Sequence, residues 1–170
     1  MQNSNCPFCG SPVTAFNLKP HAPSFSKCIQ CNLAFQDPLP SQAEIEKYYA
    51  NYHDDAHQRN PTKNEQRSIA YKQDIQTLVT ALDLNGKSLK DLVQVYDYGA
   101  SGGYLLDELS RYDIPTLLGT DLGCTSRDVL AEKGYLCDPE VLTTPTTLLI
   151  LRGVVEHMLN PFIEIPSLLN

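Results

Sequence analysis

The sequence predicts an α/β fold with a mainly parallel, doubly wound sheet of about four strands, preceded by a small cysteine-rich module. Residues 1–40 hold four of the six cysteines and six of the twelve prolines, with no helical periodicity. From residue 92 onward, short apolar runs alternate with helical patterns, which is typical of a parallel sheet covered by helices. The change in character near residue 40 therefore predicts a small module followed by a larger domain.

The amino-acid composition and the net charge limit the classes of protein to which the chain can belong. The chain has 170 residues, 42% of them hydrophobic, and a formal net charge of −7. This balance argues against a nucleic-acid binder, which needs a basic face. We see no secretory signal and no apolar run near the roughly 20 residues that span a bilayer. We therefore expect a cytoplasmic protein without a membrane partner, whose cysteines serve as metal ligands or buried thiols.

Helices and strands follow from local patterns. Ser41 and Glu44 form a capping box that starts a helix, and the apolar spacing of residues 64–84 predicts a second helix, ended by Asn85 and Gly86. The expected strands are 92–98, 116–121, 134–138 and 146–154. The expected helical stretches are 103–112, 124–134 and 156–169.

The cysteine-rich module contains two CxxC pairs, Cys6–Cys9 and Cys28–Cys31, separated by 18 residues. This spacing is typical of zinc ribbons, because each CxxC turn directs two thiolates at one point. Four cysteine ligands fill a tetrahedral shell, so the Zn²⁺ is expected to be structural. The alternatives are two disulfides or a site without metal. His21 could replace one ligand, and Cys124 and Cys137 are expected to be small buried side chains.

A glycine-rich loop follows the strand that ends at Asp97. The segment Gly99-Ala-Ser-Gly-Gly103 opens a helix, and glycine allows a sharp turn and close approach of a ligand. A tight strand-to-helix turn without a ligand also needs glycine. Asp121 ends the next strand, where an acid can accept hydrogen bonds from two ribose hydroxyls. The alternative for Asp121 is an N-cap of the helix that follows.

These residues together resemble class I S-adenosylmethionine-dependent methyltransferases. The resemblance rests on Asp97-x-Gly99 with Gly102-Gly103, on the acid Asp121 and on the segment VVEHMLNP. The cysteine-rich front is similar to the branch with an N-terminal zinc-binding module, which includes C-methyltransferases acting on nucleotide-linked sugars. The resemblance implies a zinc ribbon (1–40), a helical linker or lid (41–88) and a Rossmann-like cofactor-binding domain (89–170).

The resemblance also implies roles for individual residues. Asp97 and the loop Gly99–Gly103 flank the methionine part of the cofactor, Asp121 holds the ribose, and Leu122 packs on the adenine. Other residues implied at the cofactor are Asp138, near the adenine amino group, Arg152 and Gly153 on its other side, and Tyr49, in a helix that also carries Tyr48. For these tyrosines, ordinary packing of an amphipathic helix is the alternative.

Two features depart from the family pattern. Ser101 stands where the family has a glycine, and a positive φ there costs serine more than glycine. The family sheet has seven strands, whereas this sequence stops soon after the fourth, so we expect a truncated or degenerate member.

The expected function is methyl transfer from S-adenosylmethionine to a small-molecule acceptor. His157, beside Glu156, is the candidate general base, unless both residues only brace the helix after the fourth strand. One alternative is a non-catalytic module that binds a partner. Another is a nicotinamide-dependent oxidoreductase, although such loops carry no acid two residues before the first glycine, and no Tyr-x-x-x-Lys pair follows the fourth strand.

Overall fold

The computed structural model describes residues 5–16, 24–50, 52, 60–142 and 147–168. They form two compact units, Met1–Ile45 and Glu46–Asn170. Each unit has its own sheet and its own hydrophobic cluster. His21, the alternative metal ligand, lies outside the described residues.

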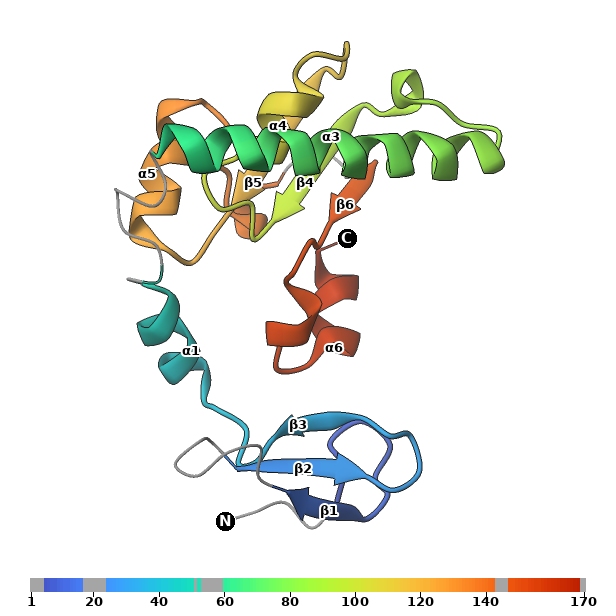
Figure 1. Cartoon of the computed structure of the whole chain (residues 1–170), viewed down its shortest axis with the longest axis vertical. Coiled ribbons are helices and arrows are strands. Elements are labelled where there is room, and N and C mark those ends of the chain that lie inside the picture. The colour runs from blue at the N-terminus through green and yellow to red at the C-terminus, as the bar shows by residue number, and fades with distance from the viewer. Residues whose placement is uncertain (1–4, 17–23, 51, 53–59, 143–146, 169–170) are drawn as a thin grey trace. The chain divides into compact units, whose positions relative to one another are not determined.

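The first unit is a three-stranded antiparallel sheet in the order β1-β2-β3 (Figure 1). Its strands are β1 (Val13–Phe16), β2 (Phe25–Cys28) and β3 (Ala34–Gln36). Cys6, Cys28 and Phe35 form its small buried cluster. A core of this size supplies little folding free energy, so the unit needs a further source of stability.

Helix α1 (Gln42–Tyr49) begins as the sequence predicts. Glu44 accepts hydrogen bonds from the backbone N–H and the hydroxyl of Ser41, and the Glu44 N–H lies 3.3 Å from that hydroxyl. The capping box is therefore confirmed. Helix α3 (Pro61–Leu84) starts three residues before the predicted position, with Asn60 as its N-cap and Pro61 in its first turn. It ends at Asn85, followed by Gly86 with a φ of +66°.

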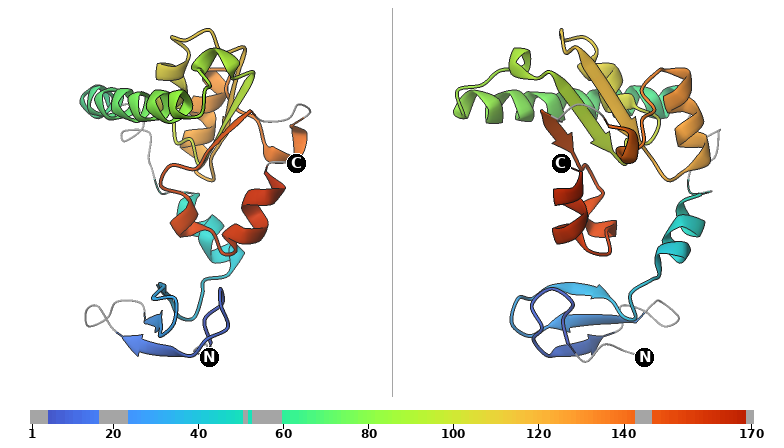
Figure 2. Two further views of the ribbon diagram at one scale, coloured as in Figure 1. Left: turned by 90° about the vertical axis from the view of Figure 1, so that its right-hand side faces the viewer. Right: turned by 180° about the vertical axis from the view of Figure 1, so that it is seen from behind.

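The second unit contains a parallel three-stranded sheet in the order β5-β4-β6, with helices against it (Figures 1 and 2). The strands are β4 (Gln94–Tyr98), β5 (Thr116–Thr120) and β6 (Leu148–Ile150). The helices after them are α4 (Tyr104–Leu109), α5 (Cys124–Glu132) and α6 (Pro161–Ser167). The chain is thus a mixed α/β protein, as predicted.

Short 3₁₀ turns complete the second unit. They are η1 (Leu89–Asp91), η2 (Pro139–Val141) and η3 (Val155–His157). Among the described residues, no helix is long and apolar enough to cross a membrane.

The predicted strand 134–138 is reduced to one parallel bridge, between Gly119 and Leu136. Gly134 turns the chain just before the bridge, with a φ of +77°. Pro139, which lacks an N–H, follows soon after it. Only a few residues can pair between these two limits. The bridge still places Leu136 beside β5, on the side away from β4.

The main hydrophobic cluster lies on one face of the parallel sheet. Val95 of β4 meets Ile75 of α3 and Leu105 of α4 there, together with Leu130 of α5. Asp97 lies two residues after Val95, so it belongs to the same face as α3. On the opposite face, the hydroxyl of the fully buried Tyr96 donates a hydrogen bond of 2.9 Å to the carbonyl oxygen of Cys137.

Candidate functional site

The four predicted metal ligands come together in the first unit. The Sγ atoms of Cys6, Cys9, Cys28 and Cys31 all lie within 4.8 Å of one another. The Cys9–Cys28 pair is 3.4 Å apart and the Cys6–Cys31 pair 3.9 Å. A zinc–sulfur bond of about 2.3 Å puts the sulfurs of a tetrahedron about 3.8 Å apart, whereas a disulfide bond measures about 2.05 Å. The cluster can therefore hold a metal ion, and it is compatible with zinc.

The backbone of each CxxC turn is shaped in the same way. The residue after the second cysteine has a left-handed conformation in both turns, with a φ of +72° at Gly10 and +60° at Asn32. The backbone N–H groups of Gln30 and Cys31 each lie 3.4 Å from Cys28 Sγ, where they stabilise negative charge. Sequence reasoning missed the role of Asn32, although asparagine is the residue after glycine that best tolerates this conformation.

The pKa values of Cys9 and Cys31 in the cluster differ. A backbone hydrogen bond from Ser11 lowers the pKa of Cys9 to about 6. At Cys31 a backbone hydrogen bond from Leu33 also acts to lower the pKa, but hydrogen bonding with Cys28 and the other thiols raises it to about 11. Adjacent thiolates repel one another, so a bound dication is what allows all four to lose their protons.

The other two cysteines lie outside this cluster. Cys124 is exposed at the start of α5, and Cys137 is partly exposed. The expectation of a buried side chain is wrong for Cys124 and is met only in part for Cys137.

The glycine-rich loop joins β4 to α4 through three left-handed residues. The φ angles are +81° at Gly99, +52° at Ser101 and +72° at Gly103. Ser101 thus has a positive φ, the conformation that costs serine more than glycine. The N–H groups of Gly99 and Ala100 both donate to the carbonyl oxygen of Thr120, at 2.9 Å each. A Cβ on Gly99 would lie 2.4 Å from Val154 Cγ2, so this glycine makes room for the segment after β6.

Asp121 ties the end of β5 to the loop. Its Oδ2 accepts a hydrogen bond of 2.9 Å from the N–H of Ser101, and its Oδ1 accepts one of 2.8 Å from the N–H of Gly123. The N-cap of α5 is Gly123, so Asp121 is not the cap of that helix. Each carboxylate oxygen has a second lone pair, so both can accept a further hydrogen bond. The adjacent Leu122 is 46% exposed.

Asp97 carries a carboxyl group that is buried near the end of β4. Its relative exposure is 4%, and no group among the described residues donates a hydrogen bond to it. Burial and, to a smaller extent, the negative charge of Asp121 raise its pKa, against a lowering effect of Arg152, to about 7. Buried carboxyl groups normally have hydrogen-bond partners. The Asp97 carboxylate can therefore accept a hydrogen bond from a ligand or pair with a cationic ligand.

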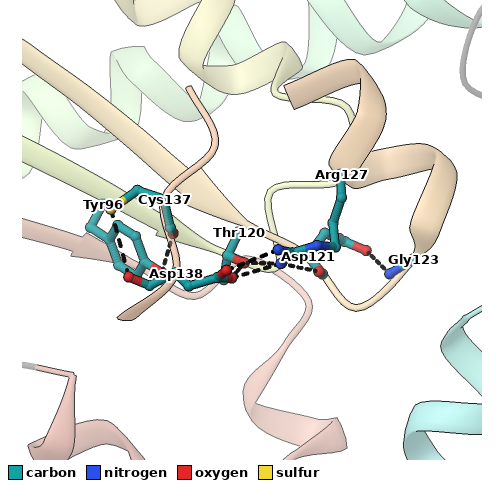
Figure 3. A network of polar contacts seen from close by, with 7 residues as sticks. All are labelled: Tyr96, Thr120, Asp121, Gly123, Arg127, Cys137 and Asp138. Carbon is teal, nitrogen blue, oxygen red and sulfur yellow. Dashed lines mark hydrogen bonds and ion pairs between the residues drawn. The ribbon is translucent and has the colours of Figure 1, made fainter. Parts of the chain in front are cut away.

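Asp138 is bound to another side chain (Figure 3). Its two oxygens accept hydrogen bonds of 2.6 and 2.9 Å from Arg127, and one also accepts a bond of 3.0 Å from the Thr120 hydroxyl. Hydrogen bonding with Arg127 lowers the pKa of Asp138 to about 2. Arg127 also lies 3.5 Å from the carbonyl oxygen of Asp121. Sequence reasoning missed Arg127, whose role depends on the packing of α5 beside the chain that follows it.

Tyr49 and His157 form a pair from distant parts of the sequence. The Tyr49 hydroxyl lies 3.0 Å from Nδ1 of His157, and the two rings are edge to face at 5.7 Å. Partial burial raises the pKa of Tyr49, and the nearby rings of Tyr48 and Tyr52 and the charges of Glu156 and Asp121 add to this effect. The end of α1 is fixed in the second unit by a bond from the Cys124 N–H to the carbonyl oxygen of Ala50.

Arg152 follows β6 and reaches toward α3. Its Nε donates a hydrogen bond of 2.6 Å to Asp74, and its guanidinium lies 4.8 Å from the centre of the Tyr71 ring. Gly153 follows with a φ of +67°, and Val154 then packs on Gly99. The structure thus brings Asp97, Asp121, Arg152 and the loop to one edge of the sheet, with Tyr49 and His157 paired in the same unit.

Comparisons with known proteins do not identify the chain: no protein-family model matches it, and no curated protein does.

Proposed function

We propose that the second unit binds S-adenosylmethionine and transfers its methyl group to a small-molecule acceptor. The observation that carries this proposal is the buried Asp97 near the carboxyl end of the central strand, to which no group among the described residues donates a hydrogen bond. A ligand that brings a positive charge to this carboxylate relieves its desolvation cost. S-adenosylmethionine carries two such charges, an ammonium and a sulfonium.

The charge of this edge argues against a dinucleotide. Asp97 and Asp121 are close enough for the charge of one to raise the pKa of the other. A pyrophosphate near two carboxylates is repelled, whereas a cationic cofactor is attracted. The free lone pairs of Asp121 suit the ribose hydroxyls, and the exposed Leu122 suits the face of an adenine.

The sheet order supports a Rossmann-like domain within this proposal. In chain order the strands are β4, β5, the bridge at Leu136 and β6, and their spatial order is Leu136-β5-β4-β6. This is the beginning of the order 3-2-1-4 of doubly wound sheets. The site at Asp97 then lies between β4 and β6, at the position where the order reverses and such sheets bind their ligands.

Bound S-adenosylmethionine supplies an activated methyl group, so the residues of the chain serve mainly to position the reactants. Asp97 and the loop orient the methionine part, and Asp121 orients the ribose. In the tautomer that carries its proton on Nδ1, His157 donates that proton to the Tyr49 hydroxyl, and the Nε2 lone pair is free to take a proton from the acceptor. Glu156 precedes His157 in the turn η3 and is exposed.

The metal of the first unit is, in this proposal, a structural Zn²⁺ held by Cys6, Cys9, Cys28 and Cys31. Four thiolates complete its coordination and leave no position for a reacting water. The small buried cluster of this unit makes the metal its main source of folding free energy.

Calorimetry with S-adenosylmethionine, S-adenosylhomocysteine and NADH tests the cofactor. We expect the first two to bind and NADH not to bind, and we expect Asp121→Ala to abolish binding of S-adenosylhomocysteine. Failure of all three ligands to bind would favour a non-catalytic module that binds a partner. Unchanged turnover in His157→Ala would remove His157 as the base.

A further inference from the structure

We propose that Arg152 binds the carboxylate of the cofactor's amino acid part, while Asp97 receives its ammonium. This inference rests on the proposed function and deepens it. Together the two side chains make a receptor for an α-amino acid zwitterion, a group that carries one charge of each sign a few ångströms apart. The receptor is assembled from the ends of β4 and β6 and from one side of α3.

The position of Arg152 is fixed from two directions. Asp74 of α3 accepts a hydrogen bond of 2.6 Å from Nε, and the guanidinium stacks over the ring of Tyr71, one turn earlier on the same helix. A guanidinium held at Nε and stacked on an aromatic ring loses little further freedom when it binds a ligand. This arrangement fixes the group without using its terminal nitrogens.

The terminal nitrogens of Arg152 remain available. In the described part of the chain, no group accepts a hydrogen bond from either of them. About half of the Arg152 side chain is exposed, at 49%. Two parallel N–H groups on one guanidinium edge match the two oxygens of a carboxylate, and such bidentate pairs are among the strongest hydrogen bonds in proteins. The free edge of Arg152 is therefore a carboxylate-binding group.

Asp97 lies near this edge and has the opposite requirement. Asp97 pairs with Ile150 of β6 in the parallel sheet, and Arg152 follows Ile150 by two residues. The positive charge of Arg152 also acts to lower the pKa of Asp97. Asp97 is 4% exposed and has no donor among the described residues. A ligand with only a positive charge satisfies Asp97 alone, and one with only a negative charge satisfies Arg152 alone. A zwitterion satisfies both.

A carboxylate at Arg152 has two possible sources, the cofactor itself and an acidic acceptor. Decarboxylated S-adenosylmethionine separates them, because it keeps the ammonium, the sulfonium and the adenosine and lacks only the carboxylate. Calorimetry on the full, zinc-loaded chain compares this probe with S-adenosylmethionine. We expect the wild-type protein to bind the complete cofactor roughly tenfold or more tightly than the decarboxylated probe.

Variants test whether Arg152 causes the preference for the complete cofactor over the decarboxylated probe. Arg152→Met is expected to weaken binding of S-adenosylmethionine to the level of the decarboxylated probe, and to leave binding of the probe itself unchanged. Arg152→Lys keeps the charge without the bidentate edge, so it restores only part of the preference. Asp74→Ala releases the guanidinium and reduces the preference. Lys90→Met is the control, because it removes a positive charge from the exposed turn η1, before β4 and at the other end of the sheet.

Each outcome decides between the two claims. Binding of neither compound by the wild-type protein would overturn the proposed function. Equal binding of both would overturn the carboxylate role of Arg152 and leave the proposed function standing. A preference for the complete cofactor that persists in Arg152→Met would also overturn the carboxylate role of Arg152. If equal binding comes with an affinity for succinate that Arg152→Met removes, the guanidinium serves an acidic acceptor instead. If Arg152→Met fails to fold, the wild-type comparison with the decarboxylated probe decides alone.

Discussion

The backbone N–H of Ser101 donates a hydrogen bond of 2.9 Å to Oδ2 of Asp121, across 20 residues of sequence. This bond joins the loop after β4 to the end of β5. Ser101 has a φ of +52°, a conformation that L-residues rarely adopt. The loop therefore carries backbone strain at the same position where it is connected to the neighbouring strand.

Replacing Ser101 by glycine should relieve this strain. Because the serine side chain also makes contacts, the informative comparison is Ser101→Gly with Ser101→Ala, which both remove the hydroxyl. We expect the glycine variant to be more stable than the alanine variant by about 1 kcal/mol, since only alanine is penalised at positive φ. Urea unfolding followed by circular dichroism measures the difference. Equal stability would mean that the loop is not left-handed at this position.

Removing the carboxylate of Asp121 should destabilise the protein even without a ligand. Asp121→Ala leaves the N–H groups of Ser101 and Gly123 without their acceptor, which costs about 1–3 kcal/mol. Asp128→Ala, at an exposed position on α5, is the matched control and should have little effect. Thermal unfolding of both variants tests this. If both lose the same stability, the two hydrogen bonds do not contribute.

The buried Asp97 predicts a specific dependence of stability on pH. Its pKa is about 7 in the folded chain and 3.8 in the unfolded chain, mainly because of burial. Between these values the folded state holds a proton that the unfolded state has lost. The contribution is therefore fully present below pH 3.8 and is lost as the pH rises through about 7.

The variant Asp97→Asn isolates this contribution, because asparagine does not titrate. From pH 4 to pH 8 the wild-type protein should lose up to about 4 kcal/mol of unfolding free energy relative to the variant. Urea unfolding of both proteins at several pH values, with zinc present throughout, measures this difference. A difference that does not change with pH would contradict the raised pKa.

Metal removal should unfold the first unit selectively. We expect one zinc ion per chain by elemental analysis, lost in the presence of a strong chelator and at acidic pH, where protons compete for the thiolates. Cys9→Ser should lower the metal content, whereas Cys124→Ser should not, because Cys124 lies outside the cluster. Protein purified without chelator and found to contain no zinc would contradict the assignment.

The metal cluster illustrates what local sequence can predict. Each CxxC turn is a local structure, so its spacing alone predicts that two sulfurs converge. The same holds for the capping box at Ser41 and for the C-terminal stop at Gly86. The prediction of a strand at 134–138 was wrong for a reason that is also present in the sequence. Gly134 and Pro139 limit the pairing of Leu136 to one bridge.

The sequence by itself determined the local features: most of the helices and strands, the two cysteine turns, and the acids near the ends of β4 and β5. Local propensity, periodicity and spacing act over a few residues, so they can be read without the fold. Only the tertiary structure decided which side chains face one another. It paired Tyr49 with His157, bound Asp138 to Arg127, and placed Arg152 on Asp74 and Tyr71, because such contacts depend on the packing of segments that lie far apart in sequence.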